Sequence, residues 1–440
     1  SAASADHGGI VRLRADRNGH YFTKIEANNR SIDALVDTVE RLWPDAVAVE
    51  LTRRGSGRPV GPAGSAGTST RADRVELAVV PNAASARLLA PADPRGCASA
   101  VQRFSAAISV KEMAQRRVVG AVTRVAGAAL LRDRVVISGP GTENIATVVA
   151  DIVGEPVQLS LGIGTVRANR KPVLGAFDTA GRPVAFVKVG DNPASIGHVR
   201  REAEALGALG ERDWRVIEVP RLLGAVEWRD MYVLVMSALV PPPWQGRDGR
   251  WPIPDAAMDE LAFIDGVDER ALADTPMWAR LQAVPGQLDS PELADEFAAA
   301  LGRVEHAVGD TTVQVGAWHG DFTPWNMARS ADRLQLWDWE RFEVGVPRGL
   351  DRLHYAVHTL SRERGFSLGS VIDGLRRGAT GAGHQDLVLA ATYLAALGSR
   401  YLLGAQGAGG EAVADHARLV LSILTELSRH VGDRPPETSP

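Results

Sequence analysis

The densest group of residues able to do chemistry in this 440-residue chain lies in AWHGDFTPWNMARSADRLQLWDWERF, residues 317–342. His319 and Asp321 are followed by Asn326, five residues after the aspartate. Asp338 comes twelve residues after Asn326, at the end of LQLWD, an alternating apolar run typical of a strand. Two carboxylates and a carboxamide that converge from a loop and a strand suit the oxygen coordination of Mg²⁺ on a nucleotide triphosphate. A carboxylate without a metal duty could instead accept a proton from a hydroxyl group.

The surrounding pattern predicts a small β-rich region followed by a larger helical one. Three strand candidates with glycine-bearing turns lie within 157–189, and a helix is predicted at 198–209. Two more strands precede the proline run at 241–243, after which the chain is mainly helical except for an insert at 311–342. Pro324 prevents a regular helix inside the insert, so we expect the two polar side chains that flank it on one loop.

The pattern H-G-D-x-x-x-x-N followed by D-W-E resembles the aminoglycoside phosphotransferase and choline kinase family, relatives of the protein kinases. The resemblance implies that Asp321 is the catalytic base or orients the acceptor hydroxyl. It implies that Asn326 and Asp338 bind Mg²⁺. It also makes His319 a structural brace of the loop and Asp351, in GVPRGLDRLHY, a support from the next helix.

The same resemblance assigns a lysine and a glutamate upstream. Lys188, in the apolar strand AFVKVG, would bridge the α- and β-phosphates of the nucleotide. Glu202, in VRREAEAL, would pair with this lysine, and Glu204 takes the role if the register is shifted. Only four of the 49 basic residues are lysines, so a lysine on a predicted strand favours a specific function.

The remaining nucleotide contacts implied by the resemblance are backbone groups. Ser237 and Leu239, in the predicted hinge at 234–239, would bind adenine, and the loop around Gly162 and Gly164 would cover the phosphates. This loop departs from the protein-kinase G-x-G-x-x-G spacing because an arginine stands where the third glycine would be.

The resemblance implies an α+β, bilobal protein-kinase-like fold with a small β-rich N-lobe and a larger α-helical C-lobe. Residues 155–239 would form the N-lobe, and residues 240–440 the C-lobe with the catalytic loop and metal site. Residues 1–154 are not covered by the resemblance, and we expect them to form an extra N-terminal cap. Within this cap, the Gly/Pro/Ser-rich segment 53–74 predicts a flexible loop.

Composition limits the other classes of function. The 49 basic and 53 acidic residues give a net charge of −4, which argues against a protein whose main role is to coat nucleic acid. The single Cys97 excludes an internal disulfide and a multi-cysteine metal site. No run of 18 apolar residues occurs, so we expect no membrane association and a cytoplasmic location.

The expected function is an ATP-dependent phosphotransferase, with GTP as a possible donor, that uses Mg²⁺ to move the γ-phosphate to a small-molecule hydroxyl. The acceptor would be a sugar, an amino sugar or an aminoglycoside-like compound. Trp325 could stack on a sugar ring. A cationic acceptor would require acidic side chains, for which Glu340, Asp265 and Asp268 are candidates.

Two alternatives remain at this point. A nucleotide-binding pseudokinase could use residues 1–150 to engage a protein partner, and the sequence does not define an oligomeric state. The segment Gly365–Gly369 matches the G-x-S-x-G hydrolase motif, but that motif needs a strand before the serine. The preceding HTLSRERG is polar and helical in pattern, so Ser367 is predicted to be a helix N-cap.

Overall fold

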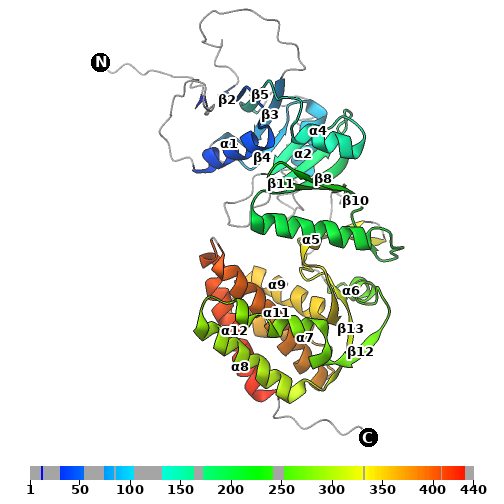
Figure 1. Ribbon diagram of the computed structural model, residues 1–440. Coiled ribbons are helices and arrows are strands. Elements are labelled where there is room, and N and C mark those ends of the chain that lie inside the picture. Colours follow the sequence, from blue (N-terminus) through cyan, green and yellow to red (C-terminus); the bar gives the residue numbers. More distant parts are fainter. Residues whose placement is uncertain are drawn as a thin grey trace, which may run out of the picture. The chain divides into compact units, whose positions relative to one another are not determined.

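The computed structural model in Figure 1 consists of two compact units. The residues that it describes are 11–12, 30–53, 74–83, 86–103, 131–162, 172–240, 252–330, 332–407 and 409–431. Unit 1 is Ser1–Arg200 with Pro220–Trp244, and unit 2 is Arg201–Val219 with Gln245–Pro440. We describe each unit by itself.

The described strands of unit 1 form one ten-stranded antiparallel sheet in the order β1-β2-β5-β3-β4-β6-β7-β8-β11-β10. Their bounds are β1 Val11–Arg12, β2 Ala48–Arg53, β3 Arg74–Val80, β4 Leu88–Pro91, β5 Asp133–Ser138, β6 Gln158–Gly162, β7 Val173–Phe177, β8 Pro183–Gly190, β10 Leu222–Trp228 and β11 Met231–Ser237. Strands from 1–154 and from 155–239 therefore share one sheet, joined where β4 pairs with β6.

Helices cover this sheet because alternate strand residues need an apolar partner. The described helices are α1 Arg30–Leu42, α2 Pro94–Arg103, α4 Ile145–Val153 and α5 Pro193–Leu209, and the division between the units falls inside α5. In β8, Val187 and Val189 are fully buried in the core that includes Ile145 and Val149 of α4. Successive strand residues point to opposite faces, so Lys188 lies on the other face of β8.

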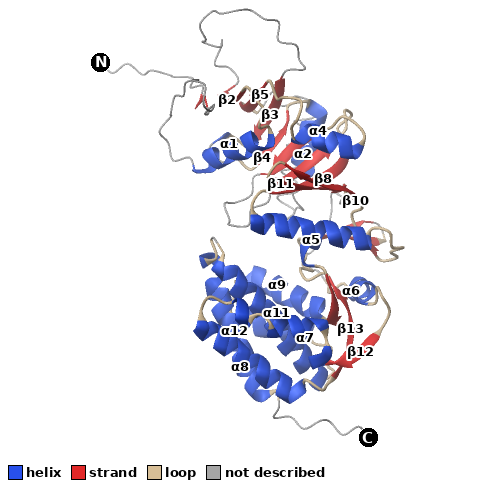
Figure 2. Cartoon of the chain, viewed as in Figure 1, coloured by secondary structure: helices blue, strands red, loops and turns tan. Residues whose placement is uncertain are grey.

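Unit 2 is mainly helical, as Figure 2 shows. Its helices are α6 Asp255–Ala262, α7 Pro276–Gln282, α8 Pro291–Val308, α9 Leu350–Arg364, α10 Leu368–Gly378, α11 His384–Gln406 and α12 Glu411–His430, with 3₁₀ turns η4 Leu272–Asp274, η5 Pro285–Gln287 and η6 Trp339–Arg341. Its described strands form two three-stranded sheets, β12-β13-β16 and β14-β15-β9. Their bounds are β9 Ile217–Glu218, β12 Asp268–Ala271, β13 Thr312–Trp318, β14 Met327–Ser330, β15 Arg333–Leu336 and β16 Glu343–Pro347.

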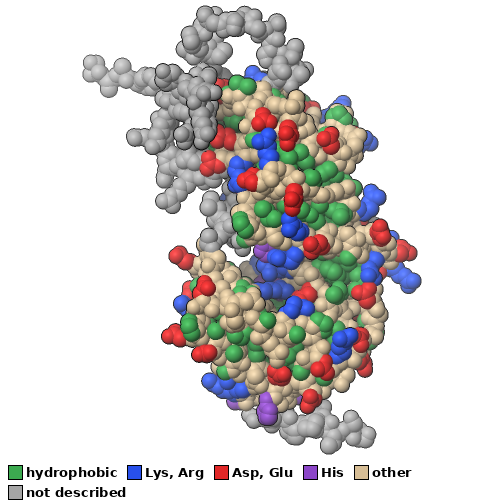
Figure 3. Space-filling view, viewed as in Figure 1, with side chains coloured by type: hydrophobic (Ala, Val, Ile, Leu, Met, Phe, Trp, Pro, Cys, Tyr) green, Lys and Arg blue, Asp and Glu red, His purple; other side chains and the backbone are tan. Residues whose placement is uncertain are grey.

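Helix α11 is long and apolar enough to cross a membrane by length and composition. Its apolar side chains, among them Val388, Leu394 and Leu402, are buried in the core of unit 2 together with residues of α8, α9 and α12. This burial is what a core helix of a folded domain requires. On the visible face of the molecule, acidic and basic side chains are interspersed (Figure 3), in keeping with their near-equal numbers.

Most predicted elements are confirmed. The strand candidates within 157–189 are β6, β7 and β8, and the predicted helix at 198–209 is α5, which begins five residues earlier at Pro193. Ser367 is the N-cap of α10, in a capping box with Ser370. Residues 54–73 of the predicted flexible loop lie outside the described residues.

The expectation of a helical chain outside 311–342 after the proline run is wrong at two strands. Strand β12 has the sequence DERA and is mostly exposed, so it carries no apolar alternation that could have predicted it. Strand β16 follows the insert directly, and both strands pair with β13. They form because β13 needs partners on both of its edges, which is a tertiary requirement.

Candidate functional site

The β14–β15 hairpin of unit 2 places Asn326 opposite the residues that lead into Asp338. Met327 pairs with Leu336 at the open end of the hairpin, and the Trp337 N–H donates to the Asn326 carbonyl at 3.1 Å. Antiparallel pairing therefore brings Asn326, which precedes β14, close to the residues that follow β15. Asp338 is among these residues, although it lies twelve positions after Asn326 in the sequence. Asn326 and Asp338 flank the same end of one hairpin.

The loop between β13 and β14 is held from below by helix α9. The carboxylate of Asp351, in the first turn of α9, accepts the backbone N–H of His319 at 2.7 Å and that of Gly320 at 3.1 Å. Burial raises the pKa of Asp351 to about 7, while the two N–H donors and the charge of Arg400 act in the opposite direction. This carboxylate fixes the start of the loop.

His319 joins the loop to the end of the hairpin. Its ring is fully buried, and Nε2 lies 3.1 Å from the Trp337 carbonyl while Nδ1 accepts the Asp321 N–H at 3.2 Å. Burial lowers the pKa of His319 to about 4, so the ring is neutral near pH 7. The hydrogen-bond partners assign the proton to Nε2. His319 is therefore a structural link, well suited to the bracing role implied by the sequence.

The turn at Gly320 requires glycine. Its φ of +73° lies in the left-handed region, and a Cβ at this position would clash with the carbonyl oxygen of Arg341 and crowd the guanidinium of Arg400. Arg400, on α11, donates to the Gly320 carbonyl and stacks over Trp318 at 4.4 Å. The turn directs the next residue, Asp321, away from β13.

Both oxygens of the Asp321 carboxylate are engaged. Oδ2 accepts the Asn326 amide at 2.9 Å, and Oδ1 lies 3.1 Å from Nε2 of His354, a buried residue of α9. The Asp321 side chain keeps 28% of its surface exposed, so an incoming molecule can still reach it. Its carboxylate is thus oriented and accessible.

The protonation states of this pair follow from burial and hydrogen bonding. Burial would raise the pKa of Asp321, but the His354 hydrogen bond and the charge of Arg341 outweigh it and place the pKa well below its usual range. Burial lowers the pKa of His354. We therefore take His354 as neutral, with Nε2 donating to ionised Asp321 and Nδ1 accepting from the Tyr393 hydroxyl at 3.4 Å.

Three carboxylates form a second group beside the hairpin. Ligand oxygens of Glu202, Asp338 and Glu340 lie within 4.8 Å of one another. Glu202 is fully buried and accepts the Trp339 N–H at 3.2 Å. Asp338 has a φ of +74°, a conformation that aspartate tolerates better than most residues. Clustered carboxylate oxygens repel one another unless a cation neutralises them, and they suit a hard divalent ion such as Mg²⁺.

Apart from Glu202, the residues expected at the nucleotide lie in unit 1. Lys188 is half-buried on β8, opposite Val173 of β7 and Leu234 of β11. The Ser237 N–H donates to the Arg221 carbonyl at 2.8 Å, so this hinge group is used within the unit.

The other predicted groups of unit 1 fall at the ends of strands or beyond the described residues. Leu239 is buried just after β11. Gly162 ends β6, and Gly164 lies outside the described residues. Among the predicted site residues, the structure brings together His319, Asp321, Asn326 and Asp351 in one network, and Glu202 with Asp338 in another.

Sequence reasoning missed the neighbours of Asp321 on α9 and α11. Asp351, His354 and His358 are spaced three and four apart, which places them on one face of α9. That spacing was a usable signal, because the first of the three had already been assigned to the loop. Tyr393 and Arg400 carried no such signal, since their roles depend on how α11 packs.

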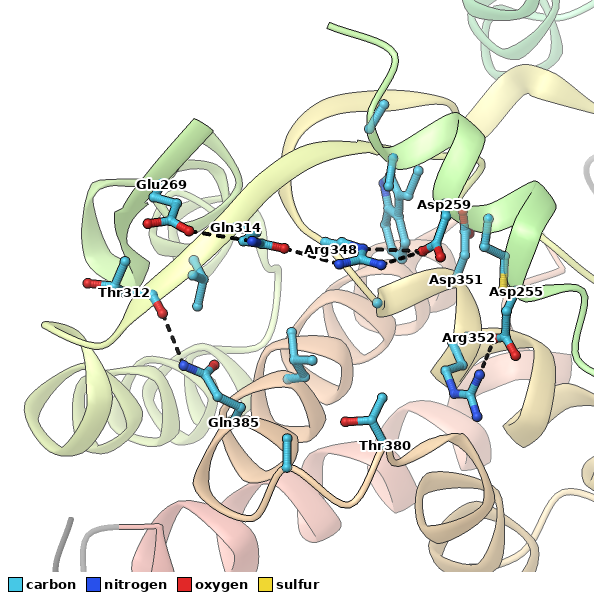
Figure 4. Close-up of a pocket in the computed structure, with 18 residues that line it drawn as sticks. Asp255, Asp259, Glu269, Thr312, Gln314, Arg348, Asp351, Arg352, Thr380 and Gln385 are labelled. Atoms are coloured by element: carbon cyan, nitrogen blue, oxygen red, sulfur yellow. Dashed lines mark hydrogen bonds and ion pairs between the residues drawn. The ribbon is translucent and has the colours of Figure 1, made fainter. Parts of the chain in front are cut away.

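A cavity of about 540 Å³ lies within unit 2 on the side of α6 and β13 (Figure 4). Two ion pairs lie in its lining: Arg348 binds Asp259 at 2.7 Å, and Arg352 binds Asp255. Gln314 links Arg348 to Glu269. The cavity lining holds four acidic side chains, Asp255, Asp259, Glu269 and Asp351, and two arginines, so carboxylates are in excess.

No protein-family model and no curated protein matches this sequence. Among solved structures, a thermostable mutant of aminoglycoside phosphotransferase APH(4)-Ia shares 13% identity over 64% of this chain and 98% of its own, with a TM-score of 0.43. Choline kinase LicA from Streptococcus pneumoniae shares 12% identity over 59% of this chain and 91% of its own, with a TM-score of 0.37. ADP-bound aminoglycoside phosphotransferase APH(2'')-Ib shares 13% identity over 62% of this chain and 94% of its own, with a TM-score of 0.33. These neighbours are the same kinds of kinase that the catalytic-loop motif resembles. Because all three TM-scores are below 0.5, we argue function from the site itself.

Proposed function

We propose that the chain is a Mg²⁺-dependent phosphotransferase that moves the γ-phosphate of ATP to a hydroxyl of a small molecule. The observation that supports this best is the carboxylate of Asp321, oriented by Asn326 and His354 and still exposed to solvent. It lies on a loop tied by His319 to the hairpin that carries Asp338. An oriented carboxylate beside a cluster of metal-binding oxygens is what phosphoryl transfer to a hydroxyl requires.

In this proposal Asp321 accepts a hydrogen bond from the acceptor hydroxyl and aims its oxygen at the phosphorus. The low pKa of Asp321 keeps the carboxylate ionised, which suits an orienting role. Phosphoryl transfer passes through a loose transition state, so positioning contributes more than strong proton abstraction. His354 prevents the carboxylate from rotating.

Asp338 and Asn326 would hold Mg²⁺, and Glu202 and Glu340 supply further carboxylate oxygens close to Asp338. The ion, when bound, would neutralise charge on the β- and γ-phosphates. All four of these residues lie in unit 2.

The nucleotide side of the proposal rests on unit 1. Lys188 would contact the α- and β-phosphates as a compact point charge, with the hinge at 234–239 and the loop at Gly162 around the nucleotide. We further propose that 155–239 is a kinase-like N-lobe, that 1–154 extends its sheet as a cap, and that 240–440 is the C-lobe. A cytoplasmic location belongs to the same proposal.

The alternative is a nucleotide-binding pseudokinase that acts through a partner. The feature that favours it is Arg167, which stands where a third glycine would complete a protein-kinase phosphate loop. A pseudokinase would bind nucleotide without transferring phosphate to any acceptor.

The two proposals differ in acceptor-dependent release of ADP. We expect the wild-type protein to release ADP with Mg·ATP and at least one member of a panel of sugars, amino sugars and amino alcohols. Chelation of Mg²⁺ and the variant Asp321→Ala should each abolish the signal. Asp332→Ala, an exposed aspartate in the turn of the same hairpin, is the matched control and should retain it. Nucleotide binding without acceptor-dependent turnover would favour the pseudokinase.

A further inference from the structure

Six aromatic and histidine rings of unit 2 form a continuous series of contacts that starts next to Asp321. His354 bonds to Asp321 and stacks on His358 with ring centroids 4.1 Å apart. His358 meets Trp325 at 6.4 Å and Phe366 at 6.3 Å. The row continues to Tyr401 and His416, which lie 5.7 and 4.3 Å from Phe366. We call these residues the ring row: Trp325, His354, His358, Phe366, Tyr401 and His416.

Much of the ring row is accessible. Four of its residues are half-buried: Trp325, Phe366, Tyr401 and His416. They come from four different segments, namely the loop between β13 and β14, the α9–α10 turn, α11 and α12. Within the part of the chain that the structure describes, Nε2 of His358 is buried and has no hydrogen-bond partner. Half-buried aromatic faces beside an oriented carboxylate form a surface on which a sugar ring can stack while one of its hydroxyls reaches Asp321.

Two arginines lie beside the ring row. The guanidinium of Arg362 lies 4.9 Å over the Trp325 ring, and Arg341 acts electrostatically on Asp321 and Tyr401. Among the described residues, neither arginine forms a salt bridge or a hydrogen bond to a carboxylate. The buried Arg400 adds a third cation to the group.

The three acidic side chains that the sequence offers for a cationic acceptor are engaged elsewhere. Asp265 pairs with Arg212 at 2.7 Å, and Asp268 pairs with Arg270 at 2.6 Å. Glu340 belongs to the carboxylate group around Asp338. These three were the candidates that the sequence offered, so the structure gives no support to an acidic acceptor pocket formed by them.

We propose that the acceptor is an anionic sugar, a carboxylated or phosphorylated monosaccharide, which stacks on Trp325 and pairs its anionic group with Arg362. This inference rests on the proposed phosphotransferase function. Unpaired guanidinium groups recognise carboxylate and phosphate oxygens through parallel N–H donors. A polycationic aminoglycoside would instead meet like charges at the same surface.

The test compares four matched acceptors: glucose, glucosamine, glucuronate and glucose 1-phosphate. We expect kcat/KM for at least one of the two anionic sugars to exceed that for glucose by about tenfold or more, since a hydrogen bond to a charged group contributes that much. Glucosamine should be the poorest acceptor. The two anionic arms separate a carboxylate from a phosphate as the recognised group. A preference for glucosamine over both would overturn the inference.

Two arginine variants localise the effect. Arg362→Gln should lower the ratio of kcat/KM for the anionic sugar to that for glucose by about tenfold, and Arg362→Lys should restore part of it. Arg364→Gln is the matched control, because Arg364 lies on the same helix, is exposed and pairs with Asp373. Equal effects of Arg362→Gln and Arg364→Gln would overturn the assignment.

The failure of this inference and that of the proposed function look different. If Asp321-dependent release of ADP persists but no anionic sugar is preferred, only the inference is overturned. If no Asp321-dependent release occurs with any acceptor or with water, the proposed function fails and the inference with it.

Discussion

At the scale of single residues, Gly320 is the most constrained position of the candidate site. Its positive φ and the clash that a Cβ would make with the Arg341 backbone leave no room for a side chain. Gly320→Ala should lower the free energy of unfolding by about 2 kcal/mol or more, the range of strained backbone positions. Because the turn aims Asp321, phosphoryl transfer should fall as well.

Denaturant unfolding with Gly302→Ala as the control checks this expectation. Gly302 lies inside α8, where a Cβ would meet nothing within 4 Å, so the alanine should be neutral or stabilise the protein. Equal stability of the two alanine variants would show that the turn at Gly320 tolerates a side chain.

His319 makes a prediction about pH. Its pKa falls from 6.5 to about 4 on folding because the ring is buried, so the unfolded chain binds a proton at a higher pH than the folded one. Neutral His319 makes its full contribution to the free energy of unfolding above pH 6.5. As the pH falls toward 4 this contribution is lost, which lowers the free energy of unfolding by about 3 kcal/mol at most. The free energy of unfolding of wild type minus that of His319→Asn should therefore decrease over this window. A pH-independent difference would contradict the buried neutral ring.

At the scale of elements, helix α9 holds the loop between β13 and β14 through Asp351. In Asp351→Asn only one side-chain oxygen remains to accept the N–H groups of His319 and Gly320, and a buried donor left without a partner costs about 1–3 kcal/mol. We expect a lower kcat with little change in the KM for ATP, because the loop carries Asp321 and the nucleotide contacts are proposed elsewhere. Steady-state kinetics decide this. A change confined to the KM for ATP would contradict the link between helix and loop.

The elements also show what the sequence can and cannot predict. The proximity of Asp321, Asn326 and Asp338 could be predicted from the sequence, because these residues are joined by one loop and one hairpin and are close in sequence. The contact of Asp351 with this loop could also be predicted, because α9 is the next helix along the chain and Asp351 lies in its first turn. The resemblance paired Glu202 with Lys188 and did not predict that its carboxylate lies close to that of Asp338, 136 residues along the chain. Only the folded helix α5 reveals this second neighbour. His354 and Arg400 depend on how α9 and α11 pack, which no local pattern encodes.

At the scale of the whole molecule, the proposed phosphotransferase function requires that unit 1 contribute to nucleotide binding. Lys188→Arg tests this, because the broad guanidinium fork cannot replace a compact ammonium at the phosphates. We expect kcat/KM for ATP to fall by about tenfold or more. Arg182→Lys, at an exposed position of the same unit, is the control and should match wild type. Full activity of Lys188→Arg would show that Lys188 has no specific role at the phosphates. The small number of lysines in the chain would then reflect its composition alone.

The central claim is that Asp321 serves transfer of the phosphoryl group rather than binding of the nucleotide. The most direct test measures Mg·ATP affinity by calorimetry and phosphoryl transfer by product formation in the same preparation of Asp321→Ala. The account predicts little change in affinity and a fall in transfer of about 100-fold or more, the range of a lost catalytic carboxylate. Transfer by Asp321→Ala at the wild-type rate would contradict it.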